Sequence, residues 1–195
     1  LYKNTWRLNQ ETFDGLKSET LNTTEFVFFP DAGLSLNYSL SKYWSLQADG
    51  FFYSSTGQQY HDYIYGQYLR KKITLRYSTV SFSVKHNFPV AGFFPPRSSV
   101  NILAGGYLSF LHHAGQTIGC ETENIISQYN RYDFGIRCGG EIEFYINNKL
   151  SVAPGIFTTF GMPNIYKGDG NIPGNLRRTN NGSGGFHITF YYHYD

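Results

Sequence analysis

Apolar and polar residues alternate along most of this chain, and a period of two predicts β-strands rather than helices. Residues 132–146 show the pattern best: one face is apolar or small, and the other carries Asp133, Arg137, Glu141 and Glu143. Strands of soluble proteins usually span about five or six residues. A strand that crosses a bilayer at a tilt needs about 9–11 residues and can project beyond it, so the length of this segment favours a membrane-crossing strand.

Four more segments repeat the pattern, over residues 26–40, 44–54, 150–160 and 186–194. Their apolar faces, like that of residues 132–146, contain no Asp, Glu, Lys or Arg, whereas charged residues occur on the opposite faces. A charge that faces lipid at mid-bilayer costs about 2–4 kcal/mol, while the lumen of a barrel tolerates charge. We therefore expect the apolar faces to contact lipid and the polar faces to line a lumen.

Three further strands are predicted over residues 1–8, 72–87 and 99–111. Within the second of these segments the apolar positions change phase near Ser78 and Thr79. A change of phase within one strand predicts a β-bulge at that point.

The eight segments predict an all-β fold: a transmembrane, antiparallel, up-and-down β-barrel of eight strands that forms one domain over residues 1–195. The predicted connections are tight at 41–43 and 147–149, medium at 88–97, and long and polar near 9–25, 55–71, 112–131 and 161–185. Short periplasmic turns that alternate with long extracellular loops are typical of outer-membrane barrels. An even number of strands then places both termini in the periplasm.

The composition agrees with a two-faced sheet. The 195 residues are 18% aromatic and only 15% charged, against about 25% charged in soluble domains, yet the mean hydropathy is −0.37. The formal net charge is +2, and no block of like charges suggests a nucleic-acid partner. No run of 18 apolar residues predicts a transmembrane helix, and the absence of a signal peptide leads us to expect a mature or trimmed form.

Several stretches resemble the small OmpA-like outer-membrane barrels, in particular the outer-membrane β-barrel proteins of Bacteroidota. They are Leu34–Gly50, Ser99–Leu111, Tyr132–Pro154 and Gly185–Tyr194; the last is similar to an aromatic closing strand, but the chain ends in Asp195 rather than Phe. The resemblance implies the same fold and a location in the bacterial outer membrane, among lipid and lipopolysaccharide. It also implies that the chain has no catalytic residues. It further implies that the chain has partners in a larger outer-membrane assembly for transport, secretion or barrel insertion.

The face expected to line the lumen carries a set of ionisable side chains. They are Asp31, Asp49, Asp133, Arg137, Glu141, Glu143, His187 and His193. Such a set could form an ion path or an acid–base site, or it could be a salt-bridged plug. Eight strands leave an interior just wide enough for side chains to fill, and unpaired charges there are costly, so we favour the plug. Arg137 is the expected counter-charge of Glu141 and Glu143.

Cys120 and Cys138 allow one disulfide, which would fit an oxidising compartment. Two free thiols, with Cys138 as a small hydrophobic residue facing lipid, are the equal alternative.

Histidines in two of the predicted loops are the remaining candidate ligands. His112 and His113, with His61 and Asp62, could bind a metal at the surface, but adjacent strand residues usually point opposite ways, and we favour solvated loops. The sequence contains no Gly-rich phosphate loop, nucleophile elbow or zinc-spaced Cys/His cluster. We therefore predict no catalytic, cofactor-binding or metal-binding residues.

The sequence favours a non-enzymatic barrel that acts as a structural or accessory subunit in the outer membrane. A lipid-modifying enzyme on a small barrel is one alternative, and it would need an outward-facing His–Ser pair within hydrogen-bond reach. A narrow pore is another, but several inward aromatic residues oppose it. A soluble lipocalin-like barrel would require apolar residues inside, the reverse of the predicted polarity.

Overall fold

The computed structural model describes residues 2–4, 7–10, 27–29, 32–64, 67–89, 98–168 and 177–193. These residues form antiparallel β-strands, with one short 3₁₀ turn at Ile126–Gln128. The strands are β1 (Tyr2–Asn4), β2 (Arg7–Gln10), β3 (Val27–Phe29), β4 (Ala32–Ser39), β5 (Trp44–Ile64), β6 (Gln67–Pro89), β7 (Ser99–Ile118), β8 (Glu121–Asn124), β9 (Tyr132–Tyr145), β10 (Leu150–Gly161), β11 (Arg177–Asn180) and β12 (Gly182–Tyr192). Within these ranges no helix is long and apolar enough to span a membrane.

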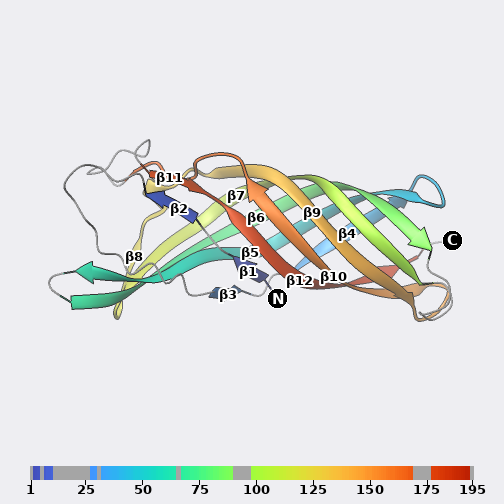
Figure 1. The fold of residues 1–195 in the computed structure, drawn as a ribbon, viewed down its shortest axis with the longest axis horizontal. Helices are drawn as coiled ribbons and strands as arrows, with labels where there is room; N and C mark the ends of the chain where they lie inside the picture. The colour runs from blue at the N-terminus through green and yellow to red at the C-terminus, as the bar shows by residue number, and fades with distance from the viewer. Residues whose placement is uncertain are drawn as a thin grey trace.

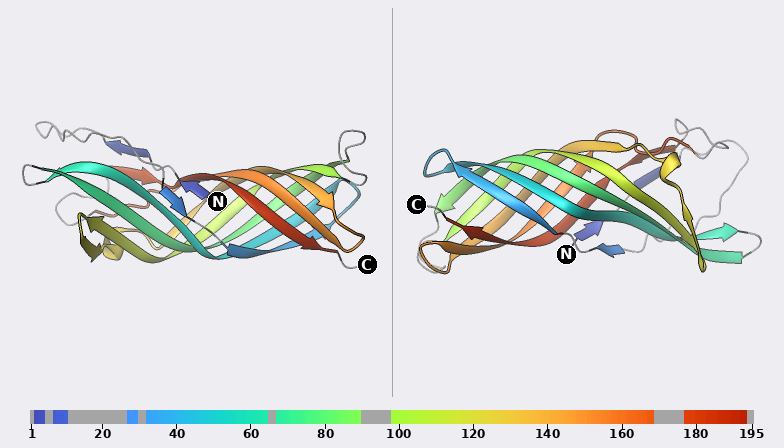
Figure 2. Two further views of the ribbon diagram at one scale, coloured as in Figure 1. Left: turned by 90° about the horizontal axis from the view of Figure 1, so that it is seen from below. Right: turned by 180° about the vertical axis from the view of Figure 1, so that it is seen from behind.

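The main sheet curls into an incomplete barrel (Figures 1 and 2). Its strands follow the order β3-β1-β12-β10-β9-β7-β6-β5-β4, and β8 adds to β7. The short turns between β4 and β5 and between β9 and β10 lie at one end, where β12 also ends, and the long hairpins project from the other end (Figure 1). We call these the short-turn end and the hairpin end.

Apart from the first, the predicted strands are present in the described residues, but three predicted loops are partly wrong. β11 and the first residues of β12 lie within the predicted loop 161–185. Residues 55–71 and much of 112–131 were expected to be polar loops, whereas β5 and β6 pair as far as Ile64 and Gln67, and β7 continues to Ile118 and pairs with β8. The strands extend beyond the predicted segments because side chains pack on the inner face of this extension. Ile73 and Leu75 lie on that face and are buried there. An inner apolar cluster stabilises a sheet that the sequence, read locally, presents as polar.

The first predicted strand is only partly present. Tyr2–Asn4 lies between β12 and β3, while Arg7–Gln10 pairs with β11 in a separate two-stranded sheet. Eight full strands are therefore not observed in the described residues.

The phase change that was predicted within β6 has a different origin. Inner and outer residues alternate along β6 without interruption, and the extra residues lie in its neighbours, at Phe52–Tyr53 of β5 and at His112 of β7. What changes is the polarity of the two faces. Toward the hairpin end the inner face of β6 is apolar, and toward the short-turn end the outer face is apolar.

An apolar cluster fills the interior near the hairpin end. Ile125 and Tyr129 from the β8–β9 connection, with Ile165 and Tyr166 from the chain after β10, pack onto the inner faces of β6 and β7. All four residues are buried. The connections thus fold back over the sheet and cover the interior from this side.

Candidate functional site

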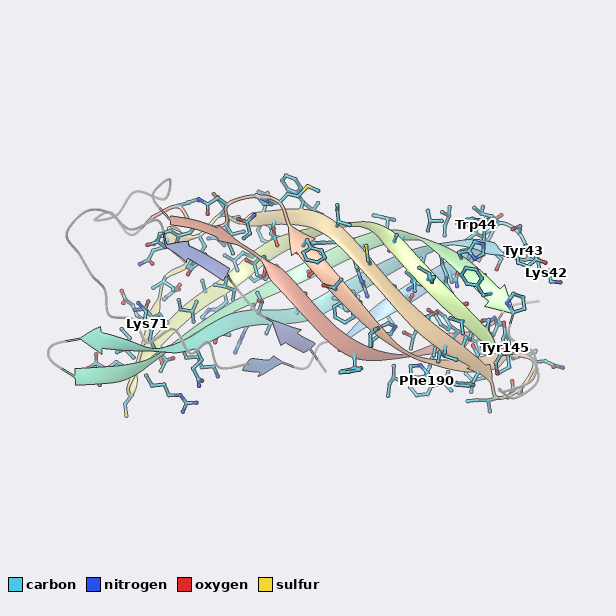
Figure 3. The ribbon with its side chains drawn as sticks, viewed as in Figure 1. Lys42, Tyr43, Trp44, Lys71, Tyr145 and Phe190 are labelled. Carbon is cyan, nitrogen blue, oxygen red and sulfur yellow. The ribbon has the colours of Figure 1, made fainter. Side chains whose placement is uncertain are left out.

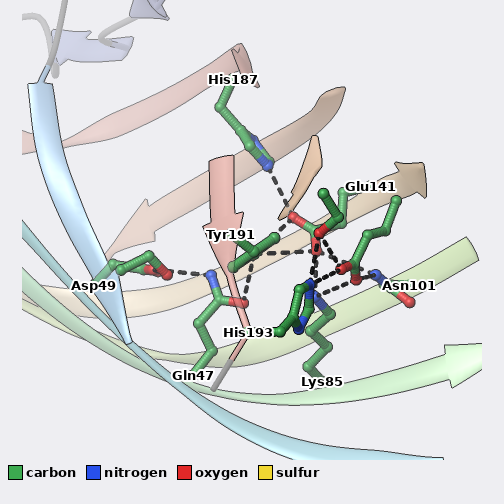
Figure 4. A network of polar contacts seen from close by, with 11 residues as sticks. Gln47, Asp49, Lys85, Asn101, Glu141, His187, Tyr191 and His193 are labelled. Atoms are coloured by element: carbon green, nitrogen blue, oxygen red, sulfur yellow. Dashed lines mark hydrogen bonds and ion pairs between the residues drawn. The ribbon is translucent and has the colours of Figure 1, made fainter. Parts of the chain in front are cut away.

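A polar network occupies the interior toward the short-turn end (Figure 4). Six strands, β5, β6, β7, β9, β10 and β12, each contribute at least one side chain to it. The period of two explains the convergence, because alternate residues of every strand in a curled sheet point to its inner face.

Lys85 of β6 forms the centre of the network. Its ammonium lies 2.5 Å from Glu141 Oε1 and 3.5 Å from Glu143 Oε2, and the residue is only 1% exposed. Asn101 Nδ2 donates to both carboxylates, at 3.2 and 3.3 Å. A buried ammonium is tolerable only with such direct partners, so Lys85 and the two glutamates stabilise one another.

Tyr191 of β12 ties the network to the opposite wall. Its hydroxyl lies 3.2 Å from both oxygens of Glu141 and 3.2 Å from Gln47 Oε1, and Lys85 Nζ lies 4.5 Å from its ring centroid. His187 Nε2 contacts Glu141 Oε2 at 3.3 Å. Strands far apart in the sequence are thereby linked across the lumen.

Ser151, His193 and Glu143 lie together, but their geometry is not that of a nucleophilic triad. Ser151 Oγ donates to Glu143 Oε1 at 2.6 Å and also lies 2.9 Å from His193 Nε2. In a triad the carboxylate holds the imidazole nitrogen that faces away from the serine. Here Glu143 Oε1 lies 3.4 Å from the same Nε2 atom, so this carboxylate does not orient His193 as the carboxylate of a triad would.

A second ion pair lies deeper in the lumen, between Asp49 and Arg137. Arg137 Nη1 donates to Asp49 Oδ2 at 3.0 Å and to Ser81 Oγ at 2.8 Å. The guanidinium also lies 5.0 Å from the ring of Phe51 and 5.1 Å from that of Phe157. Two aromatic rings and an ion pair together obstruct the middle of the lumen.

Asp133 stands apart from both ion pairs. It is fully buried, and Tyr107 OH and Asn181 Nδ2 donate to its Oδ2 at 3.0 and 2.9 Å. No ion pair to it is found within the described ranges. Two charge-assisted hydrogen bonds offset part of the cost of burying the carboxylate.

The structure brings most of the predicted lumenal set together. Asp49 pairs with Arg137, while Glu141 and Glu143 share Lys85 as their counter-charge instead of the expected Arg137. The physical reason is position: along the inner face of β9, Arg137 lies two positions from Glu141 and three from Glu143, and it reaches across to β5. Asp31 lies outside the described residues.

Sequence reasoning missed Lys85, Asn101 and Ser151, and it expected Tyr191 to face inward but gave it no part in a polar network. A signal for Lys85 was present, because it follows Ser81 and Ser83 at alternate positions opposite the apolar Phe82 and Val84. The partners from the other strands carry no local signal, since only the curling of the sheet brings them together.

The three glutamate and aspartate side chains of the two ion pairs face two permanent cations, Lys85 and Arg137. His187 and His193 border Glu141 and Glu143, with Nε2 atoms 3.3 and 3.4 Å from a carboxylate oxygen. The arrangement is a cross-linked filling of the lumen. Among the described residues no group of three or more His, Cys, Asp or Glu side chains has the arrangement of a metal site.

One further polar contact lies on the outer wall. His112 Nε2 lies 2.7 Å from Ser78 Oγ, which is also 3.3 Å from the carbonyl oxygen of Phe52. His112 and Phe52 lie in the two bulges that flank β6, and bulges commonly redirect side chains. Of the other histidines considered as metal ligands, His113 lies on β7, and the side chain of His61 lies outside the described part of the structure.

The two cysteines are free thiols in the structure. Cys120 is exposed at the turn between β7 and β8, where Gly119 adopts a φ of 59°. Cys138 lies on β9, paired with Ala104 and Thr158. Of the two alternatives for the cysteines, the structure has the unbonded one.

Neither a protein-family model nor a curated protein matches the sequence.

Proposed function

We propose that this chain is an integral β-barrel of the bacterial outer membrane, of eight strands when closed, and that it acts as a non-enzymatic structural or accessory subunit. The short-turn end faces the periplasm in this proposal, with both termini on that side, and the hairpin end faces the cell exterior. The OmpA-like resemblance and the alternation of turn lengths support this orientation.

The polarity of the sheet is the observation that carries the proposal. Toward the short-turn end the outer face is a continuous apolar band, while Ser81, Ser83 and Lys85 lie inside. The exposed apolar side chains of this band include Leu34, Leu36, Leu46, Val80, Phe82, Val84, Ile102, Leu108, Phe134, Ile136, Ile156, Phe186, Ile188 and Phe190. Apolar residues outside and polar residues inside are expected of a barrel in lipid and are the reverse of a soluble barrel.

Aromatic residues near the short-turn end support a membrane boundary there. Tyr43, Trp44, Tyr145 and Phe190 gather at this end, whereas Lys71 lies at the hairpin end (Figure 3). Trp44 and Tyr43 both pack against the ring of His86. Amphipathic rings of this kind favour the level of the lipid headgroups.

The filled interior favours a structural role over a pore. The Lys85 network blocks the short-turn end, Arg137 with its two aromatic neighbours blocks the middle, and the apolar cluster covers the hairpin end. The part of the sheet that extends beyond the band toward the hairpin end offers an exposed surface for protein partners. This surface includes the four exposed residues of β8.

Purification from native outer membranes in mild detergent, with mass spectrometry of the proteins that co-purify, tests the proposal. A stoichiometric larger barrel or lipoprotein is the expected result, and it would identify the transport, secretion or assembly process served. A monomer without partners would exclude the accessory role.

A lipid-modifying enzyme is the second candidate, because His112 and Ser78 form an outward-facing pair within hydrogen-bond reach. Against it, no described carboxylate contacts His112, so the imidazole lacks the orienting group that usually activates such a pair. Replacement of Ser78 by Ala, followed by mass analysis of the membrane lipids in cells that express either form, decides between the candidates. Identical lipid profiles with and without the wild-type protein would exclude the enzyme.

A further inference from the structure

Aromatic side chains surround His86 on the outer wall at the short-turn end. The rings of Trp44 and His86 are perpendicular, with centroids 4.3 Å apart, and the centroid of Phe88 lies 4.2 Å from that of His86. Tyr43 stacks on the imidazole at a longer distance of 6.5 Å. All three aromatic residues remain exposed, so this His86 cluster presents ring surface to its surroundings.

The His86 cluster lies where the apolar band ends. Trp44 pairs with His86 across β5 and β6, and the next outward pair along these strands is Leu46 with Val84, two exposed residues of the band. In the proposed membrane location, the row of Trp44 and His86 therefore lies at the level of the lipid headgroups. The present inference rests on that location and specifies which lipid group the cluster binds.

Lys42 adds a positive charge at the same level (Figure 3). Its ammonium lies 5.6 Å from the centroid of the Tyr43 ring, and no carboxylate of the described residues lies within ion-pair distance of it. Hydrogen bonds fix the turn that carries Lys42: Ser41 Oγ accepts from the backbone N–H groups of Tyr43 and Trp44, at 3.3 and 3.2 Å. The backbone N–H of Asn87 also donates to the carbonyl oxygen of Tyr43, at 2.8 Å. The position of Lys42 beside the cluster is thus built into the turn.

His86 supplies a hydrogen-bond donor on the same surface. Its Nδ1 is buried and has no hydrogen-bond partner among the described residues. A neutral imidazole carries one N–H, and a buried N–H without an acceptor is costly. The proton is therefore more stable on Nε2, the ring nitrogen that is not buried, where it can be donated outward. A cation and a neutral donor thus face the headgroup level together.

We propose that Lys42 and the His86 cluster bind one glycerophospholipid through its phosphodiester group. The ammonium of Lys42 and the Nε2–H of His86 donate to phosphate oxygens, the former through a charge-assisted hydrogen bond. The exposed rings of Trp44 and Phe88 contact the glycerol and the first carbons of the acyl chains, which continue along the apolar band. The phosphodiester provides the negative charge that Lys42 lacks among the described residues.

Lys149 provides a matched control in the other short turn, between β9 and β10. It is exposed at the same end of the barrel, and its carbonyl oxygen accepts from the backbone N–H of His193. The His193 side chain faces the lumen, where it contacts Ser151 and Glu143, so it is not available to a lipid headgroup. Lys149 therefore has the charge and the depth of Lys42 without the imidazole donor on the outer wall.

Native mass spectrometry of the delipidated full chain in detergent micelles, titrated with dioleoyl phosphatidylglycerol, tests the proposal. One bound lipid is expected, and dioleoylglycerol, which lacks the phosphate, should bind at least about tenfold more weakly because the charge-assisted hydrogen bond is lost. Lys42→Gln should weaken phosphatidylglycerol binding by a similar factor, Lys42→Arg should retain it, and Lys149→Gln should leave it unchanged. Equal binding of the two lipids, or equal effects of Lys42→Gln and Lys149→Gln, overturns the proposal.

The role of His86 and the source of the phosphate are tested in the same titration. His86→Phe keeps an aromatic ring and removes the N–H donor, so binding should weaken about fivefold, the equivalent of one neutral hydrogen bond. Unchanged binding in this variant would contradict the proposed contact. Sodium phosphate in large excess should not displace the lipid, because a free anion cannot contact the rings. Displacement would assign the site to a free anion and overturn the lipid assignment.

The outcome is separable from that of the proposed function. Cells that express the wild-type protein are fractionated in parallel to locate it in outer membranes. An outer-membrane protein that binds the two lipids equally would reject the phosphodiester site alone. Phosphate-selective lipid binding by a protein that is absent from outer membranes would retain the site and reject the membrane role.

Discussion

Leu75 and Val84 lie on the same strand, β6, but on opposite faces: Leu75 is fully buried inside the curled sheet and Val84 is 44% exposed on its outer wall. Both are apolar, and the strand between them has no bulge of its own. A strand that keeps its alternation while its apolar side chains change face passes between two environments. The proposed membrane boundary lies between these two residues.

A charge introduced on the outer wall should distinguish the two sides of that boundary. Phe82→Arg should destabilise the protein in phospholipid vesicles by about 2–4 kcal/mol, because the guanidinium would face hydrocarbon near the middle of the apolar band. Thr74→Arg, also on the outer face of β6 but beyond Leu75, should change the free energy of unfolding by less than about 0.5 kcal/mol. Urea unfolding followed by Trp fluorescence measures both, and equal effects would argue against lipid contact at Phe82.

Loss of the central cation should destabilise the filled interior. Lys85→Met should lower the free energy of unfolding by about 3–5 kcal/mol, because Glu141 and Glu143 would lose their buried counter-charge. Lys85→Met with Glu141→Gln should recover a large part of that loss. Lys149→Met, at an exposed turn, is the control and should stay within about 0.5 kcal/mol. A neutral Lys85→Met variant would mean that the network contributes little to stability.

The apolar cluster at the hairpin end should behave as a protein core and the outer wall as a lipid-facing surface. Leu111→Ala should cost about 2–5 kcal/mol, because the side chain is fully buried and its removal leaves a cavity. Leu108→Ala, three residues away and 55% exposed, should cost clearly less, because lipid can fill the space. Comparable losses in vesicle unfolding experiments would contradict this division.

The exposed thiol of Cys120 reports the orientation of the barrel. A membrane-impermeant maleimide added to intact cells should label wild-type Cys120, since the β7–β8 turn lies at the hairpin end. Lys42→Cys in a Cys120→Ser background, at the short-turn end, should be labelled only after the outer membrane is permeabilised. The opposite labelling pattern would invert the proposed orientation.

A filled lumen should not conduct ions. In planar lipid bilayers the wild-type protein should show no sustained single-channel steps, because the two ion pairs and the apolar cluster obstruct the interior. Steady conductance that disappears after Arg137→Trp would establish a pore through the lumen and contradict the plug.

The sequence by itself determined the secondary structure and the two faces of most strands. The alternation from Tyr132 to Tyr145 predicted β9 almost residue for residue, and it placed Asp133, Glu141 and Glu143 on the inner face, where they are buried. These properties are local, because the period of two fixes which side chains share a face. Because the pattern is only local, it could not predict that Glu141 pairs with Lys85 rather than with the expected Arg137. Which cation meets which carboxylate depends on strands that are distant in sequence.

Only the tertiary structure decided where the faces exchange polarity and which segments close over the interior. Residues 55–64 and 112–118 look like polar loops in isolation and become strands because Ile125, Tyr129, Ile165 and Tyr166 cover the inner face of that extension. Likewise, Lys85 only continues the polar face of Ser81 and Ser83 in the sequence, and it becomes the centre of a network when β6, β7, β9 and β12 curl around it. Local alternation specifies a side chain's face, but its partners and its solvent are set by the curvature and register of the whole sheet.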